Sequence, residues 1–133
     1  MENIRNYLVS FAVFLLIDMV WLGLVARTFY TKHLGYIMAD KANFVVAFVF
    51  YAIFTFGLLF FVISPALAAQ NPVKALTYGL LFGFITYATY DLTNMATLKD
   101  WPLIVTIVDL LWGTFLGGTT AWLSFMVITK LFK

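Results

Sequence analysis

The sequence predicts an all-α fold, a polytopic membrane protein built as a four-helix transmembrane bundle in a single domain, residues 1–133. The chain is 64% hydrophobic and only 11% charged, whereas a soluble domain carries about 25% charged residues. Four long apolar stretches alternate with short polar segments, and a bilayer core about 30 Å thick needs about 20 helical residues to cross it. These observations exclude a soluble domain and a disordered chain. The apolar runs are also too long, and too unbroken, for the strands of a membrane barrel.

The first span is expected over residues 4–26. It contains Asp18 and is longer than the apolar core of a signal peptide, so we interpret it as a retained helix. The following connection, residues 27–42, mixes aromatic and charged side chains such as Tyr30 and His33. That mixture is typical of a short helix lying in the headgroup layer. A polar loop with aromatic interface anchors is the alternative that the sequence leaves open.

The second span is expected over residues 43–63, with Ser64-Pro65 ending it, because proline removes a backbone donor and disfavours helix in the preceding residue. The third span is expected over residues 72–97. Its start is marked by Asn71-Pro72, a capping residue followed by proline at the first helical position.

The fourth span is expected over residues 102–131, after a similar start signal at Asp100-Trp101-Pro102. Four spans place both termini on the same side of the membrane, called side A, with the other side called side B. Basic residues divide evenly, with Arg5, Lys74, Lys130 and Lys133 on side A and Arg27, Lys32, Lys41 and Lys99 on side B. The positive-inside rule therefore gives no orientation. Cytoplasmic termini are the general habit, and insertion in both orientations is the alternative.

The residue types present narrow the chemistry. The absence of cysteine excludes thiolate catalysis and iron–sulfur clusters. The single histidine, His33, leaves too few ligands for a zinc site, and we expect no metal and no cofactor. The net charge of +2 is small and the basic residues are scattered, which excludes a nucleic-acid partner. Two GxxxG spacings, Gly79 to Gly83 and Gly113 to Gly117, predict close helix packing, within the chain or in a homo-oligomer.

Three acidic residues, Asp18, Asp91 and Asp109, fall inside predicted spans. A charge at the centre of a membrane helix costs at least about 2.5–3.5 kcal/mol, so such residues are by default functional candidates that face the bundle interior. With a rise of about 1.5 Å per residue, all three lie in the half of the membrane nearer side B. The sequence therefore predicts one acidic layer shared by three helices.

Helical periodicity adds aromatic and amide groups to this layer. Residues three, four and seven apart share a helix face, which places Tyr87 and Asn94 beside the second aspartate. The same spacing places Trp21 beside the first aspartate and Trp112 beside the third. An indole N–H is a donor that a buried carboxylate accepts. The predicted pocket therefore comprises Asp18, Asp91, Asp109, Tyr87, Asn94, Trp21 and Trp112.

No cationic side chain lies at the depth of the three aspartates, because Arg27 and Lys99 belong to the side-B boundary. Close carboxylates without a cation cannot all be ionised, so either protons or a cationic ligand must complete the site. A purely structural role, with each aspartate bonded to a neighbouring helix, is the alternative.

The motifs Asp18-x-x-Trp21-Leu22-Gly23, TYDLTN over residues 89–94 with its preceding Tyr87-Ala88, and Asp109-x-x-Trp112-Gly113, together with Phe29-Tyr30 and Trp101-Pro102, resemble a family of small bacterial membrane proteins that is catalogued as a domain of unknown function. The resemblance covers nearly the whole chain. It implies a four-helix protein of the bacterial inner membrane and brings no activity with it.

The function these observations favour is proton- or cation-linked binding and movement of a small or amphipathic solute, as in a transporter. A membrane-embedded enzyme that uses aspartate acid–base chemistry on a lipid or isoprenoid is the first alternative. A non-catalytic membrane assembly protein is the second. Whether the protein is an enzyme stays open, and the expected partners are the bilayer and a small or lipid-like ligand.

Overall fold

The computed structural model describes residues 1–132, which form helices joined by short loops, with no strand in this part of the chain. The elements in chain order are α1 (Glu2–Trp21), a π-helical turn (Leu22–Ala26), α2 (Arg27–Leu34), α3 (Phe44–Leu58), a second π-helical turn (Leu59–Ile63), α4 (Ser64–Ala68), α5 (Pro72–Thr97) and α6 (Leu103–Leu131). Because each π turn is continuous with the helices beside it, the chain builds four long helical rods.

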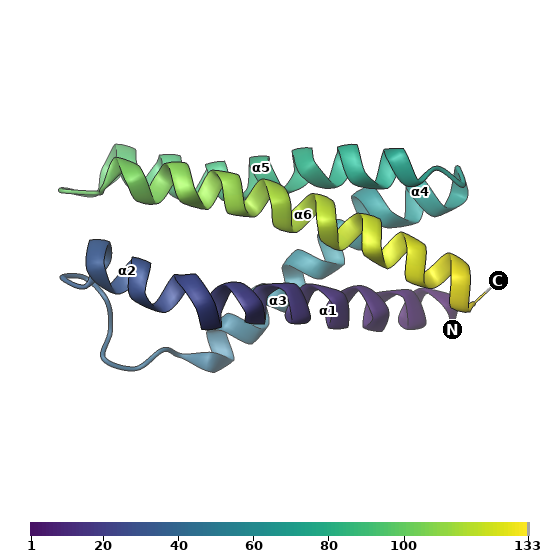
Figure 1. The fold of residues 1–133 in the computed structure, drawn as a ribbon, viewed down its shortest axis with the longest axis horizontal. Coiled ribbons are helices and arrows are strands. Elements are labelled where there is room, and N and C mark those ends of the chain that lie inside the picture. Colours follow the sequence, from purple (N-terminus) through teal and green to yellow (C-terminus); the bar gives the residue numbers. More distant parts are fainter. Residues whose placement is uncertain (133) are drawn as a thin grey trace.

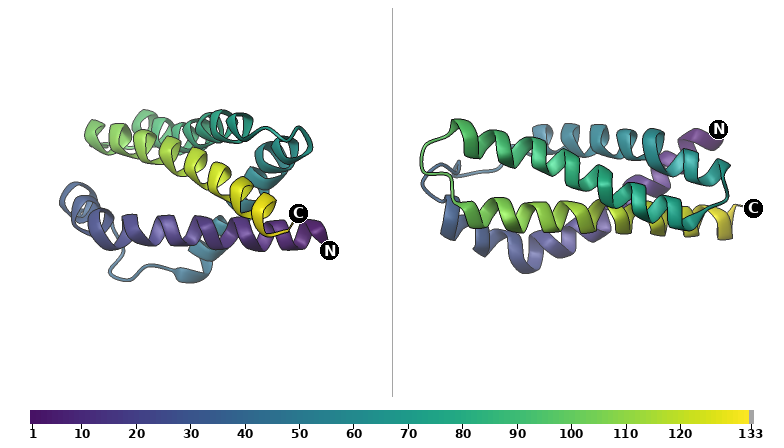
Figure 2. Two further views of the ribbon diagram at one scale, coloured as in Figure 1. Left: turned by 45° about the vertical axis from the view of Figure 1, so that its right-hand side comes forward. Right: turned by 90° about the horizontal axis from the view of Figure 1, so that it is seen from above.

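The four rods lie side by side and alternate in direction (Figure 1). Both termini lie at one end of the molecule, together with the turn between α4 and α5, and the loops that follow α2 and α5 lie at the other end. We keep the name side A for the terminal end and side B for the other. α5 and α6 lie against each other over most of their length and separate toward the C-terminal end of α6, which ends beside the start of α1, whereas α3 crosses obliquely behind α1 (Figures 1 and 2).

Three of the rods are long and apolar enough to cross a membrane, residues Glu2–Leu34, Phe44–Ala68 and Leu103–Leu131. The remaining rod, α5, has 26 residues but does not reach the same apolarity. Large apolar side chains cover the outside of the bundle, for example Phe44, Ile53 and Phe61, each more than half exposed. Such an apolar exterior suits contact with lipid tails.

The first helix is longer than the sequence predicts. Residues 27–34 are helical, as one of the two alternatives anticipated, but they continue the first helix through the π turn instead of starting a separate one. No proline lies between residues 4 and 34, so nothing obliges the helix to stop at Ala26. The helix ends at Gly35, whose N–H donates to the carbonyl of Thr31, and the rest of the segment is a loop.

The break expected at Ser64-Pro65 is absent, and that prediction is wrong. A proline in a regular helix clashes with the carbonyl four residues earlier and leaves it without a donor. Here the preceding turn is π-helical, and the N–H of Ser64 donates to the carbonyl of Leu59, five residues back. The wider turn accommodates the proline ring, so the helix continues to Ala68.

The start of the third rod agrees with the sequence prediction. Asn71 caps α5 by accepting a hydrogen bond from the N–H of Lys74 at 3.0 Å, and Pro72 occupies the first helical position. α6 begins at Leu103 directly after Pro102, without a side-chain cap. Asp100 instead forms the turn between α5 and α6, with a φ of 61°.

The GxxxG spacings form the contact between α5 and α6. A Cβ atom added to Gly79 would lie 2.6 Å from the carbonyl oxygen of Gly117, and one added to Gly83 would meet the carbonyl of Gly113. The two backbones therefore touch, as small residues allow in membrane helices. This close packing joins two helices of one chain.

A hydrophobic core on the other side of α6 joins the remaining rods. Phe14 of α1, Leu58 of the α3 rod and Leu116 of α6 are fully buried in it. The ring of Phe14 contacts that of Phe54 with centroids 5.1 Å apart. α1 and α3 are thus attached to the α5–α6 pair through side chains, without backbone contact of the glycine type.

Candidate functional site

The three membrane aspartates are all buried and come from three different helices. Asp18 of α1 and Asp109 of α6 are each 5% exposed, and Asp91 of α5 is 0% exposed. Tyr87 of α5 stands among them, near enough to all three carboxyls to sense their charge. Tyr87 is therefore the neighbour that the three aspartates have in common.

Asp109 is the best-connected carboxyl of the group. The hydroxyl of Tyr30, in α2, donates a hydrogen bond to its Oδ1. One turn earlier in α6, Thr106 accepts a hydrogen bond of 2.9 Å from the indole N–H of Trp101. The extension of the first helix through α2 is what brings Tyr30 to this position. If the helix ended at Ala26, the chain would not continue along the helix axis, and Tyr30 would not be placed beside Asp109.

Asp91 has the opposite environment. Its carboxyl adjoins that of Asp109 on the neighbouring helix, yet neither of its oxygens has a hydrogen-bond partner in the described structure. Buried polar groups in proteins are almost always paired, so an unpaired buried carboxyl needs an explanation. A proton, a water molecule or a bound cation would supply what the chain does not.

Asp18 lies in an aromatic chamber. The rings of Trp21 and Trp112 stack in parallel across α1 and α6, with centroids 4.4 Å apart and an interplanar angle of 8°. Tyr51 of α3 and Trp112 are the polar neighbours of the Asp18 carboxyl. The indole N–H of Trp112 is buried beside this carboxyl without the geometry of a full hydrogen bond, so a small displacement would let it donate to Asp18.

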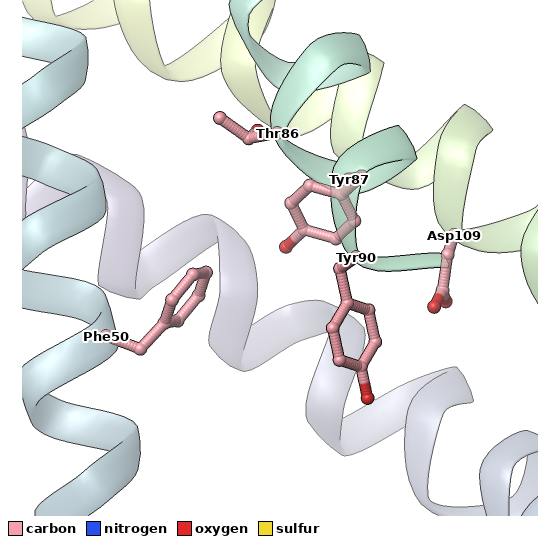
Figure 3. A pocket seen from close by; sticks show the side chains of 5 residues that line it. All are labelled: Phe50, Thr86, Tyr87, Tyr90 and Asp109. Atoms are coloured by element: carbon pink, nitrogen blue, oxygen red, sulfur yellow. The ribbon is translucent and has the colours of Figure 1, made fainter. Parts of the chain in front are cut away.

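Three adjoining cavities reach this group. One of about 210 Å³ surrounds Asp18 and includes Trp21, Trp112 and Tyr51 in its wall. A second of about 300 Å³ lies between α3 and α5, with Asp109 at its inner end (Figure 3). A third of about 330 Å³ opens toward side B. Its wall is formed by Tyr30, Leu34, Met38, Tyr90, Trp101 and Asp109.

No Lys or Arg lines these three cavities. The one ion pair in the described residues joins Arg5 and Glu2 at side A, at 3.6 Å. Within residues 1–132, no group of three His, Cys, Asp or Glu side chains is arranged to hold a metal ion. The site is thus acidic and aromatic, with no cationic partner of its own.

Five of the seven predicted pocket residues line the cavities, whereas Asp91 and Asn94 do not. Asp91 is fully buried behind the cavity walls, and Asn94 lies beside Tyr90 near the side-B end of α5. Tyr30, Tyr51 and Phe50 line the site without having been selected from the sequence. Tyr51 carried a usable signal, since it is the only tyrosine between residues 43 and 63.

Helices of this length and apolarity, with buried acids inside the bundle, define a multi-pass helical membrane protein. The chain belongs to the family described as "Predicted membrane protein (DUF2177)", whose model matches residues 3–126. This finding confirms the family resemblance seen in the motifs around the three aspartates. No curated protein and no solved structure matches the chain.

Proposed function

We propose that this protein binds a cation at the buried carboxyls and exchanges it for protons, as part of moving a small or amphipathic solute. The cavity around Asp18 and the two cavities at Asp109 form one acid–aromatic site in this proposal. α5 is taken as a fourth membrane span, because its 26 residues are enough to cross a bilayer core and α6 covers its glycine face.

The observation that carries the proposal is the charge balance. Asp18, Asp91 and Asp109 are all buried, the carboxyls of Asp91 and Asp109 adjoin each other, and no Lys or Arg lines the cavities around them. Two adjoining carboxyls in a membrane interior cannot both be ionised without a cation beside them. The charge must be neutralised by protons when the site is empty and by a cation when it is occupied.

The walls of the site support a cation more than an anion. The faces of Trp and Tyr rings attract cations, by roughly 2 kcal/mol where water is excluded. Trp21, Trp112, Tyr51 and Tyr87 all line the chamber of Asp18. Aromatic faces beside carboxyls are the usual surroundings of an organic ammonium group.

The direct test measures proton release. When a cation replaces the proton of a carboxylic acid, the proton leaves for solution and the carboxylate pairs with the cation. Adding tetramethylammonium to the protein in lipid nanodiscs, in weakly buffered medium with a pH dye, should therefore acidify the solution. Asp109→Asn should abolish the signal, whereas Asp40→Asn in an exposed loop should leave it unchanged. Cation binding without proton release, or release that persists in Asp109→Asn, would refute the exchange.

A second function, acid–base chemistry on a lipid or isoprenoid, has one observation in its favour. Asp91 and Asp109 are neighbours in unequal environments, since Tyr30 donates to Asp109 whereas Asp91 has only the Asp109 carboxyl beside it. Two carboxyls with different surroundings are what an acid and base pair requires. Incubation of the protein with bacterial lipid extract, followed by mass spectrometry, should reveal a product that Asp91→Asn fails to make.

For topology, we propose four spans with both termini on the cytoplasmic face of a bacterial inner membrane. The proposal is supported by the two termini lying at the same end of the bundle (Figure 1). Reporter fusions at the two ends should give the same location, and a fusion in the loop after α2 should give the opposite one. Reporters on opposite faces would contradict it.

A further inference from the structure

We propose that the ligand is an amphipathic organic cation, an ammonium group carrying an alkyl chain, which enters the site sideways from the lipid between α3 and α5. This inference rests on the proposed cation binding at the carboxyls and adds the ligand class and its route.

The cavity between α3 and α5 has the shape that such a ligand needs. Phe50 reaches in from α3, opposite Thr86, Tyr87 and Tyr90 on α5, and the carboxyl of Asp109 comes from α6 (Figure 3). Its volume of about 300 Å³ is at the lower end for small-molecule sites. Apart from the acid and the hydroxyls, the lining is aromatic, so the cavity has an apolar entrance and an acidic inner end.

The entrance opens to the outside of the bundle. Phe50 is 46% exposed and Tyr90 is 59% exposed, and they stand on opposite sides of the opening. Phe50 belongs to a rod that is apolar enough to cross a membrane, and its exposed neighbours Val49 and Ile53 are apolar. The opening therefore faces lipid tails, which admit an alkyl chain and exclude a bare hydrated ion.

A second route reaches the same carboxyl from side B. The cavity of about 330 Å³ at that end is lined by Tyr30, Trp101 and Asp109. Water and protons would use this route, because it opens at the loop end of the bundle. Asp109 is thus the point where an apolar entrance and a more polar one meet, which is where the head of an amphipathic cation would be placed.

The head group would be held by charge and by ring faces. Tyr87 and Tyr90 line the lateral cavity next to Asp109, so an ammonium head beside the carboxylate would also contact tyrosine rings. The alkyl chain would lie along Phe50 toward the lipid. Neutral and anionic amphiphiles of the same chain length lack the charge that the carboxyl requires.

The test compares two probes, dodecyltrimethylammonium and tetramethylammonium, by calorimetry in phosphatidylcholine nanodiscs, with empty nanodiscs subtracted. With the dissociation constant expressed as the free probe concentration in water, the affinity of the protein for the probe should rise roughly fourfold for each methylene of the alkyl chain that is buried. Phe50→Trp, which fills the entrance, should weaken binding of the dodecyl probe about tenfold more than binding of tetramethylammonium, a difference equivalent to 1.4 kcal/mol. Phe56→Trp, at a lipid-exposed site of the same helix, is the matched control and should alter neither.

The outcomes separate this inference from the proposed function. If Asp109→Asn abolishes binding of both probes while Phe50→Trp weakens neither, the ligand uses the side-B route and lateral entry is wrong. If Asp109→Asn leaves tetramethylammonium binding intact, cation binding at the carboxyls itself fails. Should Phe50→Trp weaken both probes through misfolding, Phe50→Ala decides. It removes the ring along which the alkyl chain lies, so a loss of affinity confined to the dodecyl probe supports lateral entry, whereas unchanged binding overturns it.

Discussion

Where Gly79 and Gly83 of α5 face Gly113 and Gly117 of α6, the backbones of the two helices touch. One to two turns further toward side B, the same two helices carry buried carboxyls and border cavities. The change occurs at Tyr87, whose ring lies directly on Gly113. Small residues allow close backbone approach, and large planar rings prevent it. The comparison teaches that one pair of helices serves both as the rigid base of the bundle and as one wall of its site.

The largest expected effect is at the closed end of this comparison. Gly83→Ala forces a methyl group against the carbonyl of Gly113, which is backbone and cannot move aside as a flexible side chain would. We expect a loss of about 3 kcal/mol in the free energy of unfolding, the upper part of the range for overpacking. Unfolding by sodium dodecyl sulfate, followed by circular dichroism, measures it.

The matched control for this glycine is Gly23, in the first π turn. A Cβ atom there would meet nothing within 4 Å, so Gly23→Ala should change the free energy of unfolding by less than about 0.5 kcal/mol. Equal losses at the two positions would show that the α5–α6 contact is not the tight one.

The next effect concerns the tryptophan pair at the open end. Trp112→Ala removes the stack with Trp21 that links α6 to α1 and should cost about 2 kcal/mol. The same unfolding assay measures the loss. Trp122→Ala, at a partly exposed position of the same helix, should cost clearly less. A greater loss at Trp122 would place the main α6 contact elsewhere.

A smaller effect is expected for Tyr30→Phe, which deletes the hydrogen bond to Asp109. Interhelical side-chain hydrogen bonds in membranes average about 0.6 kcal/mol and reach about 1.7 kcal/mol. Because the acceptor is a buried carboxyl, we expect Tyr30→Phe to lower the free energy of unfolding by about 1 kcal/mol. Tyr36→Phe makes the same chemical change at an exposed bond of 2.6 Å to the carbonyl of Asp100. The Tyr36 variant should lose less, and the reverse order would mean that the Asp109 bond is not formed in the membrane.

The smallest effect is expected for Thr120→Val. Its hydroxyl is buried without a partner, whereas Thr114 on the same helix donates to the carbonyl of Leu110 at 2.6 Å. Replacing an unpaired hydroxyl by a methyl group of similar shape should be neutral or stabilising, within about 0.5 kcal/mol. A loss above about 1 kcal/mol would show that an ordered water molecule pairs with this hydroxyl.

The sequence predicts a helix end correctly where residues close to that end determine it. Asn71-Pro72 set the start of α5, because capping and the first-turn proline act within a few residues. The extensions past Ala26 and through Pro65 were not predictable in this way. Both extensions run through a π turn, which lets the helix continue past Ala26 in one case and past Pro65 in the other. No residue pattern in the sequence specifies a π turn.

The same division applies to the site. Asp18, Asp91 and Asp109 were identifiable because charges inside apolar spans are costly. Phe50 was not, since it is one of many phenylalanines in its span and the rotation of α3 relative to the other helices is fixed by packing around Phe14 and Phe54. The spacing of residues along one face of α5 predicted that Asn94 lines the pocket, but the cavities end at Tyr90, one turn before it.

The unbroken first helix has a consequence for how the protein sits in its membrane. Its 33 residues make a rod about 50 Å long, against a hydrocarbon core of about 30 Å. Complete immersion would demand a tilt above about 50°, beyond the usual range of 0 to 40°. The end of α2, with Lys32 and His33, should therefore project past the lipid headgroups. Leu34 and Met38 line the side-B cavity, so its rim would stand in the aqueous phase while Asp109 stays at membrane depth. Water would then reach Asp109 through the side-B cavity, whose mouth lies outside the bilayer, without any thinning of the bilayer.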